Sequence, residues 1–378
     1  IEVGGQIAEW LSESPPEESL EQRMEIASAL LALIELDPSG VPGGDEAVAQ
    51  AAARLARSEP TGAAGLYLGE GGIAVALARA GRLLGDAELR AAARDRAAHL
   101  AAITPRGNDL FSGAAGALRA LLIMWREEED EGELPAAATA MGDALVAAAE
   151  EAGEGELRWR SPPDPGEPVG ALHVGYAHGS AGIADVLLDL AEAGGEPRFR
   201  DAAVTGARWV LGQALPALPD GQGVAWPEQE GGEATPPLWC RGSTGIGAFL
   251  LHLDRANALE RARERAEGAA RTVARGGRFL GPTSCHGLAG SVEFLLDVHT
   301  ATGNPTWLDE ADTIANLLVA FRDDEGTWRS DSGEPMPFDL LTGRAGVAVA
   351  LLRLSDPGGH RPILEVPPGS RRRTAASA

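Results

Sequence analysis

Several features that mark other protein classes are scarce in this sequence. Its 378 residues include only two cysteines, too few for the disulfide framework of a small secreted protein. Aromatic residues make up 4% of the chain, which favours helices packed through small residues over a β-rich core. No apolar run approaches the roughly 20 residues of a membrane-spanning helix, and no signal peptide is visible. We therefore expect a cytoplasmic protein.

Positive charge is also scarce. The 32 Lys and Arg residues face 56 Asp and Glu residues, which gives a formal net charge of −24. A surface this acidic repels the phosphates of nucleic acids and the headgroups of anionic membranes. We therefore expect neither as a partner. It would attract basic peptides, although a solvated acidic face is the simpler explanation of the same charge.

Glycine, in contrast, is abundant and periodic. A Gly-x-x-Gly pair followed by an apolar helical run occurs six times in the sequence. The pairs are Gly69 and Gly72, Gly113 and Gly116, Gly179 and Gly182, Gly242 and Gly245, Gly287 and Gly290, and Gly343 and Gly346. The intervals between them are long enough for two helices each.

Amphipathic stretches lie between these motifs, with Arg, Glu or Asp on one face and Ala, Leu or Val on the other. This alternation predicts apolar inner helices and amphipathic outer helices. The stretches Leu20 to Leu36 and Asp45 to Arg57 add a further pair. We predict an all-α fold in which about seven helical hairpins close into an α/α toroid over residues 1–355, followed by a disordered tail over 356–378.

The residues just before each glycine pair are the candidates for chemistry. If the inner helices all begin at one end of the ring, these residues face a common cavity, and glycine permits close approach of a ligand or neighbour. The alternative is that the glycines serve tight packing alone. Two long Pro- and Gly-rich loops, residues 161–170 and 227–239, are candidate binding loops over the cavity.

Both cysteines occupy such positions. Cys240 and Cys285 lie 45 residues apart, each directly ahead of a glycine motif, and His286 follows Cys285. Two thiolates and one imidazole are an established zinc ligand set, and the missing fourth ligand leaves a position for water or substrate. A disulfide or two buried thiols are the alternatives.

The segments YAHGSAG, WCRGSTG and SCHGLAG, in this order, resemble the hallmarks of the lanthionine synthetase C-like (LanC) family, and the resemblance extends from about Gly62 to Arg353. It implies an α/α toroid with Zn²⁺ bound by Cys240, Cys285 and His286. It also implies a zinc-dependent lanthipeptide cyclase, which adds peptide Cys thiols to dehydroalanine or dehydrobutyrine and so forms lanthionine or methyllanthionine.

The resemblance also implies catalytic residues. His178 matches the family's acid/base histidine, although a histidine that caps a helix would look the same. Asp109 would orient and charge that histidine, but Asp339 has the same offset from its glycine, and Asp before a helix is an ordinary N-cap. Arg241 departs from the pattern of some members, and would either stabilise an enolate or bind a loop carboxylate. His173 and Tyr176 are further cavity candidates.

Three other functions compete with the cyclase. A zinc protein of the same family that binds glutathione or other small thiols would carry the same residues, and so would a non-catalytic scaffold. An α/α-toroid glycosidase would need paired carboxylates such as Asp109 and Asp339, and would leave the cysteines unexplained.

The partners that the cyclase implies are a dehydrated precursor peptide and dehydratase domains or proteins of the kinase or lyase type. The chain begins with Ile1 rather than Met, which suggests a domain of a multidomain synthetase, although a standalone cyclase fits the sequence equally well.

Overall fold

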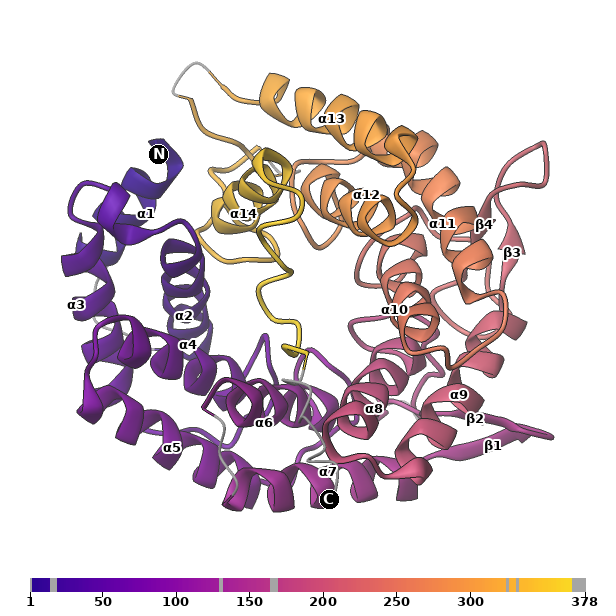
Figure 1. Ribbon diagram of the computed structural model, residues 1–378, viewed down its shortest axis with the longest axis horizontal. Coiled ribbons are helices and arrows are strands. Elements are labelled where there is room, and N and C mark those ends of the chain that lie inside the picture. Colours follow the sequence, from indigo (N-terminus) through magenta and orange to yellow (C-terminus); the bar gives the residue numbers. More distant parts are fainter. Residues whose placement is uncertain are drawn as a thin grey trace, which may run out of the picture.

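The computed structural model describes residues 2–13, 19–128, 132–163, 169–323, 326–330 and 333–368. Figure 1 shows two concentric rings of α-helices around a central bore. The inner helices are α2 (Leu20–Glu35), α4 (Glu70–Leu83), α6 (Ala114–Glu128), α8 (Ser180–Gly194), α10 (Ser243–Arg255), α12 (Leu288–Thr302) and α14 (Arg344–Ser355). The outer helices are α1 (Glu2–Glu13), α3 (Gly44–Arg57), α5 (Ala87–Ala102), α7 (Glu133–Ala147), α9 (Pro197–Gly212), α11 (Ala262–Gly276) and α13 (Pro305–Ala320).

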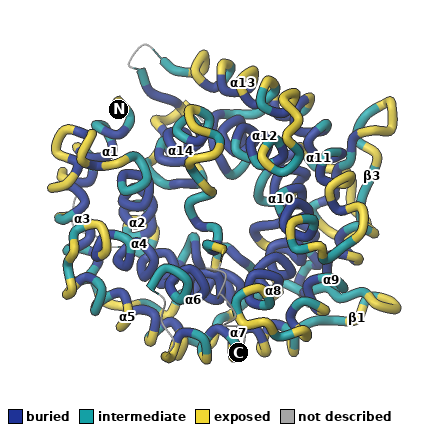
Figure 2. The backbone as a smooth tube through the Cα atoms, viewed as in Figure 1, coloured by how far each residue is buried: buried dark blue, intermediate teal, exposed yellow. Residues whose placement is uncertain are grey.

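The two rings differ in how they are buried, as Figure 2 shows. The inner helix α6 is buried continuously from Ala114 to Met124. The outer helix α11 buries a stripe of small residues and exposes its Arg- and Glu-rich face. Inner helices are covered on both sides and outer helices on one, so their sequences differ as the periodicity indicated. The predicted all-α toroid is therefore confirmed.

The ring closes where its first and last helices meet. The inner helix α14 packs against α2 and against the outer helix α1. Trp10 of α1 stacks on Phe338, with ring centroids 5.0 Å apart. The backbone N–H of Phe338 donates to Glu25 of α2 at 2.9 Å. Helix α1, which the sequence patterns did not predict, thus supplies the outer partner of the last inner helix.

Short elements decorate the outer wall. β1 (Glu150–Gly153) and β2 (Glu156–Arg158) form one antiparallel hairpin, and β3 (Leu215–Pro216) and β4 (Val224–Ala225) form another. Two 3-10 turns, η1 (Pro38–Gly40) and η2 (Gly277–Phe279), complete the described elements. Within the described residues, no helix has the length and apolar character needed to cross a membrane.

Beyond α14, residues 357–368 cross the bore (Figure 1). Leu364 and Val366 are buried there, and Arg79 of α4 donates to the Ile363 carbonyl at 2.5 Å. The remainder of the expected tail, residues 369–378, lies outside the described residues, as do residues 164–168 of the first candidate loop.

A buried ionic cluster joins three neighbouring inner helices. Asp185 of α8 accepts hydrogen bonds from Arg119 of α6 at 2.6 Å and from Tyr176 at 2.5 Å. His252 of α10 lies 2.7 Å from the other oxygen of Asp185. Burial opposes protonation of His252, but the charge and hydrogen bond of Asp185 outweigh it and raise the pKa of His252 to about 10.

This cluster predicts a loss of stability at alkaline pH. A raised pKa in the folded state means that the contribution of His252 is full below its unfolded pKa of about 6.5 and disappears as pH rises towards 10. We expect the free energy of unfolding, measured by denaturant titration, to fall over this window. His252→Gln should cost about 3–5 kcal/mol at pH 6.5 and flatten the dependence. His299→Gln, at a half-buried position outside this cluster, is the control, and an equal effect there would contradict the assignment.

Candidate metal centre and active site

Each inner helix that follows a glycine pair begins on a turn folded back against it. A Cβ atom on the second glycine would collide with a backbone carbonyl oxygen of the turn just before it. At Gly182 that oxygen belongs to Tyr176, and at Gly290 to Ser284. The second glycine of the motif is therefore required by packing, and it brings the pre-glycine residues close to the helix axis.

Backbone hydrogen bonds then join the turns of successive repeats. The residue two positions before the first glycine offers its carbonyl to two N–H groups of the preceding turn, at 2.8–3.2 Å. The acceptors are Phe111, Ala177, Cys240 and Cys285, and the N–H of Cys285 donates in turn to Leu341 at 2.8 Å. Equivalent positions of neighbouring repeats are thus held side by side at one mouth of the ring.

The two cysteines occupy this same position in adjacent turns. The N–H of Cys240 donates to the Cys285 carbonyl at 3.2 Å. The Cys285 thiol hydrogen-bonds the Cys240 sulfur, and this bond lowers the pKa of Cys240 to about 7 against the effect of burial. The same bond, together with burial, raises the pKa of Cys285. Of the two neighbouring thiols, Cys240 therefore has the lower pKa.

Two sulfur donors in contact fit zinc, which prefers thiolate and imidazole ligands. Within the described part of the chain, no three or more His, Cys, Asp or Glu side chains form a group that could hold a metal. Cys240 and Cys285 are together, whereas the imidazole of His286 is not grouped with them. The backbone N–H of His286 donates to Thr283 at 3.3 Å, and its side chain is half-buried.

His178 lies in the turn that precedes the turn of Cys240. Its Nδ1 is 3.6 Å from Asp109 Oδ1, and its ring packs against Phe111 at 5.1 Å. The interaction with Asp109 raises the pKa of His178 despite partial burial. Burial opposes ionisation of Asp109, but hydrogen bonds from His178 and Ser112 outweigh it and lower the pKa of Asp109. The imidazole side chain is 52% exposed, so a substrate can reach it.

Asp109 and Asp339 each lie four residues before the first glycine of a pair, but their surroundings differ. Asp339 accepts hydrogen bonds from the N–H groups of Leu341 and Thr342, at 2.7 and 2.6 Å, as a turn cap does. Asp109 accepts from the N–H of Ser112 at 2.7 Å and also faces His178. Only Asp109 of the two therefore combines the cap with an imidazole partner.

Arg241 has a loop carboxylate as its partner. Its Nη1 lies 3.0 Å from both oxygens of Glu228, which belongs to the second candidate binding loop. Both side chains are exposed and line the same cavity as the cysteines.

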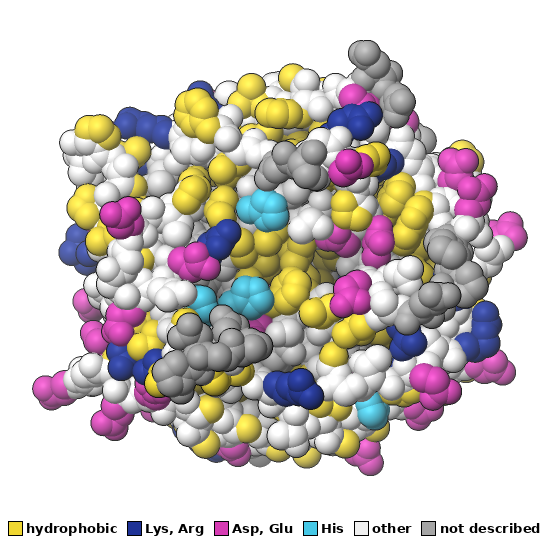
Figure 3. Space-filling view, turned by 180° about the vertical axis from the view of Figure 1, so that it is seen from behind, with side chains coloured by type: hydrophobic (Ala, Val, Ile, Leu, Met, Phe, Trp, Pro, Cys, Tyr) yellow, Lys and Arg dark blue, Asp and Glu magenta, His cyan; other side chains and the backbone are white. Residues whose placement is uncertain are grey.

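The two cysteines, His178, Asp339, Glu228 and Arg241 line one cavity of about 570 Å³, whereas His286 and Asp109 are not among its lining residues. Its lining includes both cysteines, His173, His178, Tyr67 and Phe111. Figure 3, which views the ring from behind, shows histidine side chains gathered around a hollow with hydrophobic side chains inside it. The sequence patterns did not single out Tyr67 and Phe111. Both nevertheless lie two residues before the first glycine of a pair, which is the position of both cysteines.

Comparison with known proteins gives one family and several similar solved structures. The family model described as lanthionine synthetase C-like protein matches residues 26–365. This chain belongs to the lanthionine synthetase C-like family. Among solved structures, the LanC-like chain is similar to one titled "Nisin cyclase", with a TM-score of 0.67 and 18% identity over 94% of this chain and 93% of that one. The sequence prediction of the family is confirmed.

Two further solved structures are less similar. A structure titled "Crystal structure of sugar epimerase from ruminal bacterium" has a TM-score of 0.49 and 13% identity, over 75% of the LanC-like chain and 86% of that one. One of a D-mannose isomerase has a TM-score of 0.47 and 11% identity, over 75% and 85%.

Proposed function

We propose that this protein is a zinc-dependent lanthipeptide cyclase, which adds the thiol of a peptide cysteine to a dehydroalanine or dehydrobutyrine of the same peptide. The single observation that carries the proposal is that the neighbouring thiols of Cys240 and Cys285 line one cavity with His178, whose imidazole has Asp109 beside it. The family match and the similarity to the nisin cyclase structure support it.

Cys240, Cys285 and His286 would hold the metal. His286 directly follows Cys285 but is not grouped with the two sulfurs, so its imidazole would have to turn towards them to complete the ligand set. A bound Zn²⁺ would lower the pKa of a substrate thiol and keep it as a nucleophilic thiolate. The remaining steps fall to the protein's own side chains.

The reaction is an addition without a leaving group or a change of oxidation state. The S–H bond breaks, a C–S bond forms at the β-carbon, and the C=C double bond becomes an enolate. A proton then adds to the α-carbon, so the product has the same mass as the linear peptide. The protein must therefore take one proton from the thiol and supply one to the α-carbon.

His178 is suited to both proton transfers. Asp109 holds its imidazole from one side, which stabilises the imidazolium after it accepts a proton and fixes the ring's direction. The exposed edge faces the cavity. The cavity also contains Arg241, whose charge would help to stabilise the enolate, although its ion pair with Glu228 makes it a weaker candidate than His178.

The test uses the zinc-loaded chain and a linear peptide that contains one Cys and one dehydroalanine. Ring closure leaves the mass unchanged, so it is measured as the loss of one N-ethylmaleimide adduct in mass spectrometry. We expect closure at least about 100-fold faster than without protein. A peptide with Ala in place of dehydroalanine is the control, and equal rates with and without protein would exclude the cyclase.

The competing functions give different results in the same experiment. Addition of glutathione to the dehydroalanine, seen as a mass increase of one glutathione, would favour the small-thiol protein. Binding of peptide without any reaction would favour the non-catalytic scaffold.

A further inference from the structure

The cysteine cavity has an acidic side. Four carboxylates line it, those of Glu21, Glu25, Glu228 and Asp339. Arg241 is the one arginine among the described residues of the lining, and its Nη1 already donates to both oxygens of Glu228 at 3.0 Å. Within the described part of the chain, the other three carboxylates accept hydrogen bonds from neutral groups only, and none has an arginine partner.

The histidines of this cavity do not balance its charge. His178 already has Asp109 beside it, 3.6 Å from its Nδ1. The four lining carboxylates and Asp109 make five negative charges, whereas Arg241, His173 and His178 supply at most three positive ones. A Zn²⁺ ion held by two thiolates adds no net charge. The cavity therefore keeps an excess of negative charge even when both histidines are protonated.

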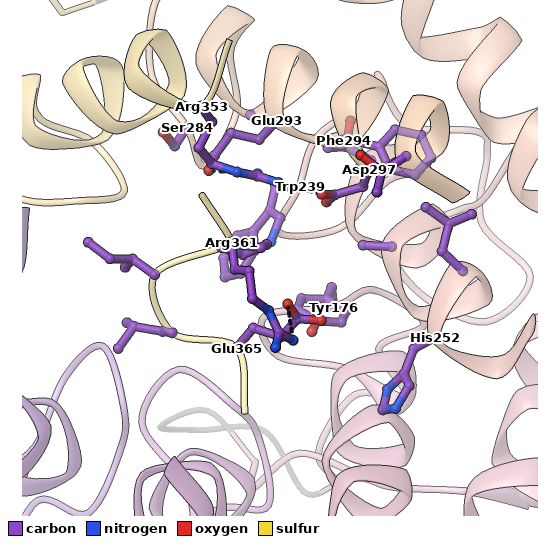
Figure 4. A pocket seen from close by; sticks show the side chains of 18 of the residues that line it. Tyr176, Trp239, His252, Ser284, Glu293, Phe294, Asp297, Arg353, Arg361 and Glu365 are labelled. Carbon is purple, nitrogen blue, oxygen red and sulfur yellow. Dashed lines mark hydrogen bonds and ion pairs between the residues drawn. The ribbon is translucent and has the colours of Figure 1, made fainter. Parts of the chain in front are cut away.

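The neighbouring cavity in the bore, of about 600 Å³, is arranged differently. Its acidic side chains have arginine partners, as Figure 4 shows. Arg353 pairs with Glu293 at 3.2 Å and also with Asp297. Arg361 pairs with Glu365 at 3.1 Å. A carboxylate removed from water without a cation is costly, so pairing is the arrangement to expect inside the ring, and the cysteine cavity departs from it.

Helix α2 carries much of the acidic side. Glu21, Glu25 and Ser28 all line the cavity, and residues three and four apart lie on one face of a helix. Glu21 and Glu25 are like charges at the spacing that destabilises a helix. The N–H of Phe338 donates to Glu25 at 2.9 Å, which brings the adjacent Asp339 close. Burial, together with repulsion from Asp339, raises the pKa of Glu25. Glu25 thus has two negatively charged neighbours and no cation.

A hydroxyl without a partner lies on the same face of α2. Ser28 is 9% exposed, and its Oγ makes no hydrogen bond within the described residues. A helical serine often donates to the carbonyl four residues earlier, as Ser12 does to Ala8 at 3.0 Å. The unpaired Oγ of Ser284 is fully enclosed, whereas that of Ser28 keeps a surface that opens into the cavity. Ser28 therefore offers a buried acceptor to a ligand beside Glu25.

We propose that this face of α2 binds the side chain of a lysine in the substrate peptide, close to the residues that form the ring. The ammonium would donate to Glu25 and to Ser28 Oγ, while the reacting thiol lies at the two cysteines. Among the described residues these carboxylates form no group that could hold a metal ion, so an organic cation is the fitting ligand. The proposal rests on the proposed cyclase function, because it names a feature of that enzyme's substrate.

The size of the cavity limits where the lysine lies. A cavity of about 570 Å³ is about 10 Å across, a length that an extended peptide spans in about three residues. The experiment therefore uses linear peptides with one Cys, one dehydroalanine and one Lys that stands one, two or three residues from the Cys. Each has a counterpart with norleucine, which keeps the hydrocarbon chain and lacks the ammonium.

Equal amounts of the two members of a pair are mixed with the zinc-loaded chain, and closure of each is followed by loss of the N-ethylmaleimide adduct. We expect at least one pair in which the Lys peptide closes about tenfold faster at about 50 mM salt, and a smaller preference at about 500 mM. Equal rates within all three pairs would overturn the lysine site and leave the cyclase function standing.

A binding measurement separates the two proposals. The same pairs with Ala in place of dehydroalanine cannot react, and their Kd values are measured by calorimetry. At least about fivefold tighter binding of a Lys peptide, without closure of any reactive peptide, would support the lysine site and reject the cyclase. Equal binding within every pair would reject the lysine site.

Variants then locate the contact. Glu25→Gln should reduce the Lys preference to below about twofold, and Ser28→Ala should reduce it at least about twofold. The preference is a ratio within one variant, so a general loss of activity cancels. Because Ser28 Oγ has no partner, the alanine variant should fold even if Glu25→Gln does not. Glu260→Gln, an exposed carboxylate outside the cavity, is the matched control and should keep the parent's preference. A full preference in both Glu25→Gln and Ser28→Ala would refute the site on α2.

Discussion

Replacement of Cys285 by alanine is expected to reduce bound zinc from about one ion per chain to nearly none, and to abolish ring closure with it. The variant leaves Cys240 without its neighbouring sulfur, and zinc affinity should fall by more than about 100-fold, since even the loss of outer hydrogen-bond partners costs 10–100-fold. Metal content after dialysis, measured by plasma mass spectrometry, gives the result directly.

Two companion variants make this result specific. His286→Ala should also lose zinc by at least tenfold if its imidazole completes the ligand set. Glu228→Gln changes an exposed carboxylate of the same cavity and should keep the full zinc content. A folded Cys285→Ala variant that still holds one zinc per chain would refute the proposed metal site.

Replacement of His178 by alanine should leave the zinc content unchanged but slow ring closure by about 10²–10⁴-fold, which is the usual contribution of a general acid or base. Its imidazole lies beside Asp109, outside the predicted ligand set. The adduct assay compares it with His173→Ala, which removes the other histidine of the cavity lining and should cost less than tenfold. A His178→Ala variant that cyclises at the parent rate would end the acid/base assignment.

The pH profile of the same reaction examines Asp109. Because this carboxylate raises the pKa of His178, Asp109→Asn should lower that pKa. If neutral imidazole accepts the thiol proton, the rate rises with pH through the His178 pKa, and the acidic limb of the variant should therefore move to lower pH. An unmoved limb would assign Asp109 to turn capping alone.

The sequence could predict that the two cysteines lie side by side, because this depends only on their equivalent positions in the repeat. Each lies two residues before a first glycine, and a repeated turn places equivalent residues of adjacent repeats side by side. The same register would also have identified Tyr67 and Phe111. The direction of the His286 side chain was not predictable, since consecutive residues of a turn point in different directions and local sequence does not determine which faces the bore.

The sequence could not predict the long-range ion pairs, and the reason is different. Arg119 and Asp185 are 66 residues apart, and each lies in a largely apolar inner helix. Nothing local indicates which carboxylate will meet which guanidinium. The Pro- and Gly-rich residues 357–368 likewise have only scattered apolar side chains, and Leu364 and Val366 become buried only because the bore offers them a surface.

The periodicity of apolar residues and the spacing of glycines determined the toroid, its repeats and the side-by-side cysteines, because these depend on local helix geometry and on backbone contacts that recur in each repeat. The tertiary structure decided the closure by α1, the buried ionic cluster between α6, α8 and α10, and the orientation of His286. These features depend on which helices become neighbours around the ring, and burial then determines which charges must pair.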